Sequence, residues 1–567
     1  MVSKKYIHKF YTHGKEKLIM IDRINIQKVK INKLETNNSK QSFKGIETPL
    51  LTGLRGLNNS PALGACAVDL CSMVIPRTAI EMKNRGQQAG IEAAFREGAS
   101  CLIHACVGLV GLGAATLLSG KFNNQYGVKA QNIFANEQTI NNLAHVWEKS
   151  AGQKEFFQSF AKNINGLNGA KWRGLSDKAS ESIVDNLVKL AEKSKQMSVS
   201  GADKKVLAGE IKDLKNIVLA QITKDTGAQA SFRLNAIKDS TGKVLQKGVS
   251  SSLSELVDNA VVLSNSFATK SKTEVPKFAK ALIKNKNAGT ILGLGICAAL
   301  CMSIQPLNRY MTKKRTGEDG FVGVENKKAD TSKGFKFLKT ALGIGFPAVA
   351  ISSIGKLPEL MSNVQFNSKI PTLNQFKFLY SLTIGSRFLA ARDPNELRES
   401  VIKDTLGYTN WLILGGMVSK LVARGIGGKE LINNPVAQEG KKGIGYAFKW
   451  LTKTSVKSFD EVLMPKAKDI AKNGKVLKFS EMYKLADKAT KSKVAKIAGS
   501  QIAGYLYSGL VLGVGIAKLN IFITKKVQAR KDAKEGMKEN IEKNPKVDTS
   551  FAKENLASSS SVFKEFN

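Results

Sequence analysis

The segment from Ala99 to Gly120 reads ASCLIHACVGLVGLGAATLLSG and carries no charge if His104 is neutral. Its apolar run, Cys101 to Leu118, is close to the roughly 20 residues that a helix needs to cross a hydrocarbon core. Two further apolar segments of similar length, 287–308 and 497–517, have a basic residue on both sides. We therefore predict an all-α, membrane-associated protein with three helices long enough to span.

Shorter apolar segments leave the number of spans open. Residues 340–355 and 405–419 suit buried helices or marginal spans, because both fall short of a full hydrocarbon core. The segment 61–75 is interrupted by Asp69. A charge at that place favours a re-entrant or interfacial helix over a span.

Small residues recur at four-residue spacing in the last two long segments. The pairs are Gly289 and Gly293, Gly295 and Ala299, Gly499 and Ala503, Gly504 and Ser508, and Gly509 and Gly513. This spacing places small side chains on one helix face, where backbones pack closely in lipid. In water each interior glycine costs about 1 kcal/mol relative to alanine. The pattern favours packed membrane helices. A small-residue face that is not used within the chain would bind a helix of a partner protein or of a second copy of this chain. A buried helical hairpin of a soluble protein is the alternative.

Two octamers that close these glycine-rich segments resemble each other. Residues 307–314 read LNRYMTKK and residues 519–526 read LNIFITKK, with five of eight positions identical. Upstream, LCSMVIPR at 70–77 resembles LYSLTIGSR at 379–387 in the same order. A basic-acidic step then enters the next apolar segment, Arg96-Glu97 in the first copy and Lys403-Asp404 in the second. The common order predicts an internal duplication with two related halves, from about 61 to 315 and from about 372 to 526.

The pattern divides the chain into nine stretches. They are a largely disordered basic leader (1–60), apolar helices of the first half (61–120), a polar helical insert (121–286), a glycine-rich helix closing the first half (287–315), a connector with an apolar helix at 340–355 (316–371), helices of the second half (372–424), a polar basic insert (425–495), a glycine-rich helix closing the second half (496–526) and a charged, partly disordered tail (527–567).

The first insert has the periodicity of soluble helices. Ile183, Leu187 and Leu190 share one face of a predicted helix over 176–193, and a second helix is predicted over 206–222. Ser252-x-x-Glu255 has the spacing of a capping box that opens a third helix.

Basic residues dominate the charge and point to anionic partners. Lys and Arg number 87 against 46 Asp and Glu, a net charge of +41. The clusters that end the two glycine-rich helices suit anionic lipid head groups, each charge contributing about 1 kcal/mol. This predicted lipid interface consists of Arg309, Lys313, Lys314, Arg315, Lys525 and Lys526, with Asn308 and Asn520 expected to cap or cross-link the helix ends. Nucleic acid is disfavoured because lysine is spread along the chain and the aromatics do not interleave with arginine. A soluble basic helical protein that binds nucleic acid or anionic surfaces remains the alternative.

The same clusters predict orientation. By the positive-inside rule both would face the cytoplasm. Both inserts would then lie outside, yet the second carries Arg424, Lys429 and Lys441 near its membrane end, which conflicts with the rule. The N-terminal stretch lacks the apolar core and cleavage site of a secretory signal. We expect a cytoplasmic membrane of the bacterial type, reached without a cleaved signal peptide.

No catalytic, cofactor-binding or nucleotide motif is present, so a non-enzymatic role is expected. Residues 425–430 superficially resemble a phosphate loop but lack its first glycine and its Ser or Thr, and are expected to form a helix-ending turn. A metal site at the four cysteines between 66 and 106 is disfavoured by their five-residue spacing.

A membrane transporter or channel with a site between the halves is the other alternative. It needs a polar path, for which the sequence offers four candidates in or near apolar helices: Asp69, Arg77, His104 and Arg387.

Overall fold

The computed structural model describes residues 47–163, 177–197, 203–226, 236–238, 244–247, 252–317, 329–355, 357–366, 371–433, 444–463 and 478–543. The chain separates into two units, Met1–Pro49 and Leu50–Asn567. The architecture below is that of the second unit. The predicted leader up to residue 46 and the predicted tail after residue 543 lie outside the described residues.

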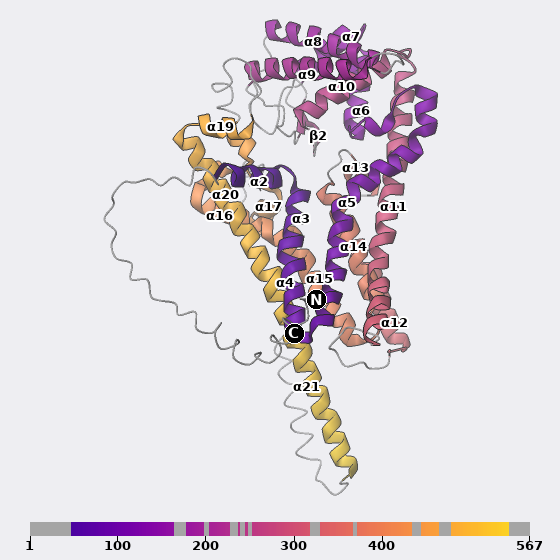
Figure 1. Ribbon diagram of the computed structural model, residues 1–567, viewed down its shortest axis with the longest axis vertical. Coiled ribbons are helices and arrows are strands. Elements are labelled where there is room, and N and C mark those ends of the chain that lie inside the picture. The colour runs from indigo at the N-terminus through magenta and orange to yellow at the C-terminus, as the bar shows by residue number, and fades with distance from the viewer. Residues whose placement is uncertain are drawn as a thin grey trace, which may run out of the picture. The chain divides into compact units, whose positions relative to one another are not determined.

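The described chain is an all-α fold, as the sequence predicts (Figure 1). The first elements are α2 (Glu47–Asn59), α3 (Pro61–Val68), the π-helical turn η1 (Asp69–Val74), α4 (Ile75–Arg85), α5 (Gln87–Tyr126) and the short η2 (Ala130–Asn132). The first insert holds α6 (Glu137–Glu148), α7 (Gln153–Asn163), α8 (Asp177–Gln196), α9 (Lys204–Thr226), β1 (Ala236–Lys238), β2 (Val244–Lys247) and α10 (Leu253–Phe267).

The remaining elements lie between residues 275 and 543. They are α11 (Val275–Thr316), α12 (Lys333–Ser352), α13 (Leu357–Val364), α14 (Leu373–Leu389), α15 (Pro394–Thr409), the π-helical η3 (Asn410–Leu414), α16 (Gly415–Gly427), η4 (Gly428–Leu431), β3 (Ile432–Asn433), α17 (Ile444–Lys453), β4 (Ser455–Val456), α19 (Phe479–Leu485), α20 (Lys488–Ser508), the π-helical η6 (Gly509–Gly515) and α21 (Ile516–Lys543). Helix α2 occupies the end of the segment expected to be a disordered leader, where Leu51 and Leu54 are buried.

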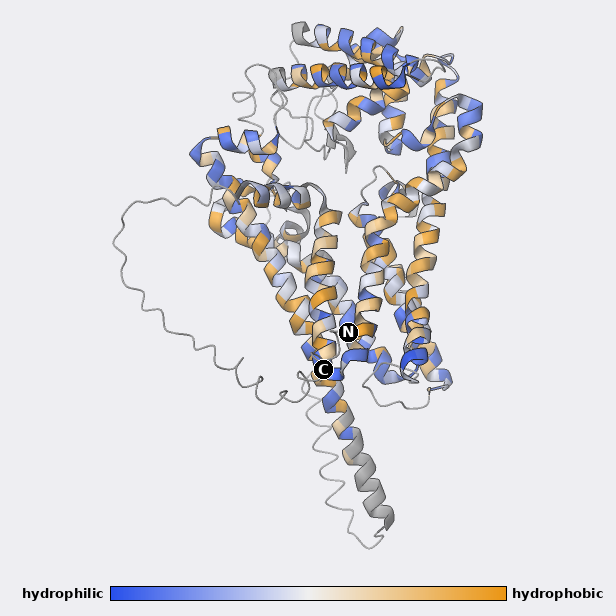
Figure 2. Cartoon of the chain, viewed as in Figure 1, coloured by the Kyte–Doolittle hydropathy of each residue, from blue (hydrophilic) through white to orange (hydrophobic). Residues whose placement is uncertain are grey.

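Five helical stretches of the described chain are long and apolar enough to cross a membrane. They are Ala62–Arg85, Gln87–Tyr126, Val275–Thr316, Lys333–Ser352 and Lys488–Val527. Figure 2 shows extended hydrophobic stretches along them, whereas α6 to α10 mix hydrophobic and hydrophilic residues. The three long segments predicted from the sequence are all among the five.

The first of these stretches differs from its prediction. Helix α3 runs through η1 into α4 without a break, and the result is 24 residues long instead of a short interfacial helix. Asp69 does not interrupt it, because its side chain is buried within hydrogen-bond reach of the Cys101 thiol on α5. A carboxyl group that faces a neighbouring helix does not have to meet lipid.

Each predicted half contains an antiparallel helix pair that packs through small residues. In the first, Gly289 of α11 lies against Ala115 of α5, and Gly293 lies against Gly111 one turn further along. In the second, α20 packs on α16 where a Cβ at Gly504 would come within 2.9 Å of the Gly415 carbonyl oxygen. The predicted small-residue faces are therefore helix contacts at these positions. Gly295 and Gly499 face open space instead.

The two halves also pack across each other. The turn η1 and helix α4 of the first half lie against η6 of the second, where a Cβ at Gly513 would come 2.4 Å from the Ser72 carbonyl oxygen. In turn, α14 of the second half packs on α11 of the first, and Ser386 donates a hydrogen bond of 2.6 Å to the Met302 carbonyl oxygen. Helix α12 covers α14 from the other side, with Gly385 against Gly343 and Pro347.

The helices of the inserts bury apolar side chains against one another. The predicted helices over 176–193 and 206–222 are α8 and α9, and the predicted capping box at Ser252 and Glu255 opens α10. Ile183 and Leu187 are fully buried, as their periodicity requires. Two small antiparallel ribbons, β1 with β2 and β3 with β4, are the sheets of the described residues. Helix α16 ends at Gly427, and Gly428 follows with φ +67°, which confirms the predicted helix-ending turn.

Candidate functional site

Glu97 of α5 lies at the centre of a group of buried charges. Its Oε1 is 3.5 Å from Arg77 Nη1, 3.3 Å from Arg96 Nε and 3.8 Å from Lys403 Nζ. Its Oε2 accepts a hydrogen bond of 3.1 Å from Arg387 Nη2. All these side chains are at most 7% exposed. One carboxylate thus compensates cations from both predicted halves.

Asp404 completes this group. Its Oδ1 accepts a hydrogen bond of 2.8 Å from Arg387 Nη1, so the Arg387 guanidinium bridges the carboxylates of both halves. We call Arg77, Arg96, Glu97, Arg387, Lys403 and Asp404 the central ion-pair cluster. Losing one partner of a buried ion pair costs about 3–5 kcal/mol, because the other charge is left uncompensated.

Further ion pairs connect the halves beside the central ion-pair cluster. Arg85 of α4 forms a two-pronged pair with Glu399 of α15, at 2.8 and 3.1 Å. Thr524 of α21 donates a hydrogen bond of 3.2 Å to the same carboxylate. Arg309 of α11 pairs with Glu396, which also pairs with Arg392. The last turn of α4 and the adjoining helix ends are thereby tied to α15.

Hydrogen bonds near the π-helical turns also join the two predicted halves. A π-helical turn leaves carbonyl groups without their ordinary intrahelical partners and often occurs at functional positions. Arg77 Nε donates to the Leu512 carbonyl oxygen within η6, at 3.3 Å. Trp411 of η3 donates to the Ala65 carbonyl oxygen just before η1, at 3.1 Å. All three π-helical turns of the described chain therefore take part in contacts between the halves.

Several buried polar atoms at the centre have no hydrogen-bond partner among the described residues. They are Arg77 Nη2, the Tyr380 hydroxyl and Asp404 Oδ2. Gly407 of α15 lies beside two of them, because a Cβ there would come 3.3 Å from Arg77 Nη2 and 3.9 Å from the Tyr380 oxygen. Buried polar atoms without partners are rare in folded proteins and call for a bound water or ligand group.

The four predicted polar-path residues converge only in part. Arg77 and Arg387 both belong to the central ion-pair cluster. His104 is 1% exposed and lies edge-on to the rings of Phe376 and Tyr380, with centroids 5.7 Å away. Its Nδ1 lies 3.4 Å from the Ser100 hydroxyl oxygen, and its Nε2 has no partner among the described residues. Asp69 faces Cys101 instead of joining the ion pairs directly.

The predicted lipid-interface residues divide into two groups. Lys313, Lys314, Arg315, Lys525 and Lys526 are exposed, as that prediction requires. Arg309 differs, because its guanidinium is committed to Glu396. Asn308 and Asn520, expected to cap or cross-link helix ends, are buried within continuous helices and do not cap them, while their cross-linking stays a prediction.

The sequence marks Arg77 and Arg387 as candidates but assigns no role to their partners. Glu97, Lys403 and Asp404 were visible only as a charge step repeated in both halves. That repetition was the available signal, because a charged pair at the entry of two apolar helices is expensive unless it is compensated. Nothing local marks Glu399 or Tyr380, whose positions depend on packing between distant segments.

Metal ligands do not gather in the described part of the chain. No group of three or more His, Cys, Asp or Glu side chains there has the arrangement of a metal site. All six cysteines are free; three are buried, two are half-buried and Cys71 is exposed.

No protein-family model, no curated protein sequence and no solved structure matches this chain. Its function is therefore argued from its own residues.

Proposed function

We propose that the chain is a non-enzymatic integral membrane protein built from two tandem-related halves and resident in a cytoplasmic membrane of the bacterial type. The observation that carries this proposal is the apolar outer face of its long helices. Large hydrophobic side chains on the candidate spans are strongly exposed, among them Leu102 (65%), Leu117 (78%), Ile291 (62%), Phe337 (77%), Val349 (72%) and Leu510 (68%).

Such faces suit lipid better than water. Soluble monomers seldom expose contiguous apolar patches of more than a few hundred Å². The candidate spans bury charge on the inside and expose leucine, isoleucine and phenylalanine on the outside, which is the arrangement expected of helices in a bilayer. The alternative of a soluble basic protein would leave these faces in water.

Two features support the internal duplication. Within the octamers, Asn308 and Asn520 are buried, and so are Thr312 and Thr524. Leu307 and Leu519 are exposed by 47% and 44%, and Tyr310 and Phe522 by 64% and 62%. Matched burial follows from a shared helix face in two equivalent environments.

Reciprocal packing is the second feature. The first segment of each half packs on the glycine-rich helix that closes the other half. In the first half this segment is η1 with α4, which contacts η6. In the second half it is α14, which contacts α11. Arg77 and Arg387 then reach the same carboxylate, Glu97. Tandem copies related by an axis along the membrane normal would produce such an exchange.

The halves run in the same direction in this proposal. Arg309 and Thr524, close to the two basic helix ends, bind Glu396 and Glu399 near the start of α15, so both basic ends lie on one side. The small-residue contacts make the middle and closing helices of each half antiparallel, and both inserts therefore lie on the other side. The positive-inside rule then assigns Lys313 and Lys525 to the cytoplasm. Arg424, which opposes this assignment, lies over the Trp450 ring at 4.8 Å, a contact that accounts for its place in the second insert.

Transport between the halves is a second candidate, favoured by the unpartnered polar atoms of Arg77, Tyr380 and Asp404. Reconstituted protein would be tested for flux of protons and small ions across liposomes. Flux that falls in Arg77→Gln and Asp404→Asn but not in Lys205→Gln, on the first insert, would support it. Identical flux in protein-free liposomes would remove it.

Alkaline carbonate extraction of a membrane pellet tests the main proposal. The protein should stay in the pellet and require detergent for release, because its exposed apolar faces would be covered by lipid. Recovery in the carbonate supernatant or in the soluble fraction would overturn it. A known peripheral protein and a known membrane-spanning protein serve as controls that calibrate the supernatant and the pellet.

A further inference from the structure

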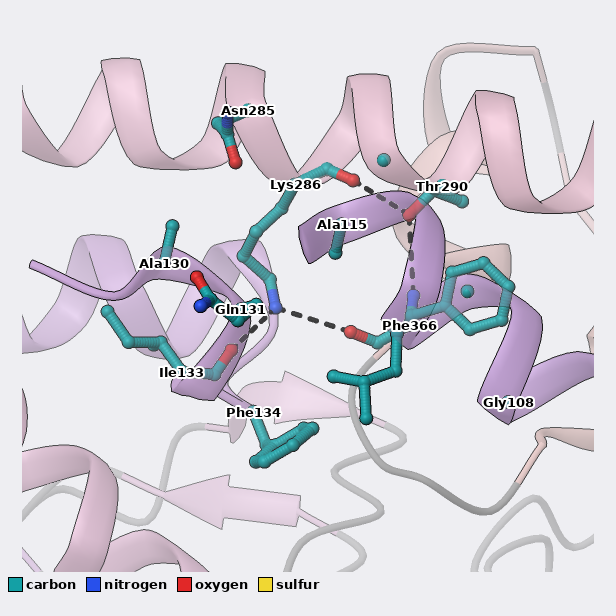
Figure 3. A pocket seen from close by; sticks show the side chains of 13 residues that line it. Gly108, Ala115, Ala130, Gln131, Ile133, Phe134, Asn285, Lys286, Thr290 and Phe366 are labelled. Atoms are coloured by element: carbon teal, nitrogen blue, oxygen red, sulfur yellow. Dashed lines mark hydrogen bonds between the residues drawn. The ribbon is translucent and has the colours of Figure 1, made fainter. Parts of the chain in front are cut away.

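A small cavity lies away from the central ion-pair cluster, between α5, α11, the η2 segment and Phe366, which follows α13 (Figure 3). Its volume is about 30 Å³, and its wall includes Gly111, Ala115, Gln131, Lys286 and Phe366. A cavity needs about 10–15 Å³ to hold one water, so this space holds two waters, or two oxygens of a group that enters from its open side. It is too small for a whole metabolite.

Lys286 provides the charge of this cavity. Its Nζ donates to the Ile133 carbonyl oxygen at 2.8 Å and to the Phe366 carbonyl oxygen at 3.2 Å (Figure 3). An ammonium group has three protons, so one donor remains. No residue that lines the cavity is an aspartate or glutamate, and Lys286 forms no ion pair among the described residues. The half-buried positive charge is therefore uncompensated.

Gln131 contributes a second donor. Its Oε1 accepts hydrogen bonds from Ser119 at 2.9 Å and from Asn123 at 3.2 Å, which fixes the amide orientation. No hydrogen bond of the amide nitrogen is formed among the described residues, which leaves it available to a ligand, and Gln131 lines the same cavity as Lys286 (Figure 3). The carbonyl acceptors at Ile133 and Phe366 are already used by Lys286. Spare donors, no carboxylate and one uncompensated cation favour an anion.

The position of the cavity along the helices indicates where that anion comes from. Ala115 lies one turn before the end of the apolar run of α5, and Lys286 directly precedes the apolar segment of α11. The cavity thus lies at the boundary between apolar spans and the first insert. Lipid phosphate groups occupy this level of a bilayer. Free phosphate from solution has the same chemistry.

We infer that Lys286 and Gln131 form a site for one phosphate group, delivered by a phospholipid head group or by inorganic phosphate. Such a ligand would supply the missing counter-charge and would tie the first insert and the segment before α14 to α11. Binding of inorganic phosphate does not depend on the membrane proposal, so failure of one does not imply failure of the other.

The test uses the full chain purified in detergent and follows thermal unfolding. Inorganic phosphate is compared with chloride at equal ionic strength, and phosphatidylglycerol with a phosphate-free galactolipid in mixed micelles. Bound ligand should raise the unfolding midpoint by about 2–4 °C. A rise with inorganic phosphate identifies a site open to the solvent, and a rise with phosphatidylglycerol alone identifies a lipid site.

Two variants and one control assign the effect. Gln131→Glu keeps the acceptor for Ser119 and Asn123 but removes the spare donor and supplies a negative charge, so the ligand-dependent rise should disappear in a folded protein. Lys286→Met should abolish it as well. Lys284→Met, an exposed lysine on the same helix, should retain the full rise. No rise in the unmodified protein, or an undiminished rise in Gln131→Glu, would overturn the inference.

Discussion

Glu97 is the shared counter-charge of the buried cations where the two predicted halves meet. One carboxylate lies within ion-pair distance of Arg77, Arg96, Arg387 and Lys403, and it is almost completely buried. Charges in such surroundings are stabilised only by each other, because neither water nor lipid compensates them. The central ion-pair cluster is therefore both the most specific and the most fragile contact of the described chain.

Neutralising Glu97 should destabilise the protein severely. We expect Glu97→Gln to lower the free energy of unfolding by about 3–5 kcal/mol, because several buried cations lose their shared counter-charge. Unfolding of the detergent-purified protein by heat or denaturant measures this loss. The matched control is Glu210→Gln on α9, whose pair with Lys193 is exposed and should contribute less than about 1 kcal/mol. Equal effects of the two substitutions would contradict the assigned role.

The Arg85–Glu399 pair should show strong coupling. Arg85→Met leaves the buried Glu399 carboxylate without its ion-pair partner, and Glu399→Met leaves Arg85 with only its longer pair to Glu81, at 3.4 Å, whereas the double substitution removes both charges. A double-mutant cycle should therefore give an interaction energy of about 0.5–3 kcal/mol, with the double variant more stable than the sum of the singles predicts. Additive effects would mean that the two side chains do not interact in the folded protein.

At the scale of the elements, small residues set how closely helices approach. Where α20 continues into η6, Gly513 lies against η1 and α4, and Gly499 of the same continuous helix faces open space. The sequence showed the spacing of these glycines but could not distinguish a packed face from a free one, because that depends on which helix lies opposite.

A methyl group at these two glycines should have opposite effects. In Gly513→Ala the new Cβ would come 2.4 Å from the Ser72 carbonyl oxygen and 2.9 Å from Pro76 Cβ, so η6 and η1 must separate and stability falls. In Gly499→Ala nothing lies within 4 Å, and the helix gains up to about 1 kcal/mol from the better propensity of alanine. Unfolding midpoints of the two variants decide this, and a Gly513→Ala protein as stable as the parent would refute the close contact.

The sequence predicts some of the helices and leaves others undetermined. The long apolar helices and α8, α9 and α10 follow from composition and periodicity, which are local properties. The course of 61–85 was not predictable, because whether Asp69 interrupts the helix depends on Cys101 of another helix. Likewise, the sequence marked Arg77 and Arg387 as candidates but not Glu97 as their common partner, since the Arg387–Glu97 pair joins residues 290 positions apart.

At the scale of the whole molecule, one arrangement accounts for the charges, the glycines and the exposed apolar faces together. In the proposed arrangement, two parallel halves exchange their first helices, bury their charges where they meet and present apolar faces outward. The inserts would then lie at one end of the helices and the exposed lysines of α11 and α21 at the other.

Sided labelling of single cysteines tests this arrangement most directly. With the six native cysteines replaced by alanine, one cysteine is placed at Lys205, Lys429, Lys313 or Lys525, all exposed. An impermeant thiol reagent is applied to sealed right-side-out and inside-out membranes. Lys205→Cys and Lys429→Cys should react from one side, and Lys313→Cys and Lys525→Cys only from the other. Reaction of Lys313→Cys and Lys525→Cys from opposite sides, or of all four from both sides, would contradict two parallel membrane-spanning halves.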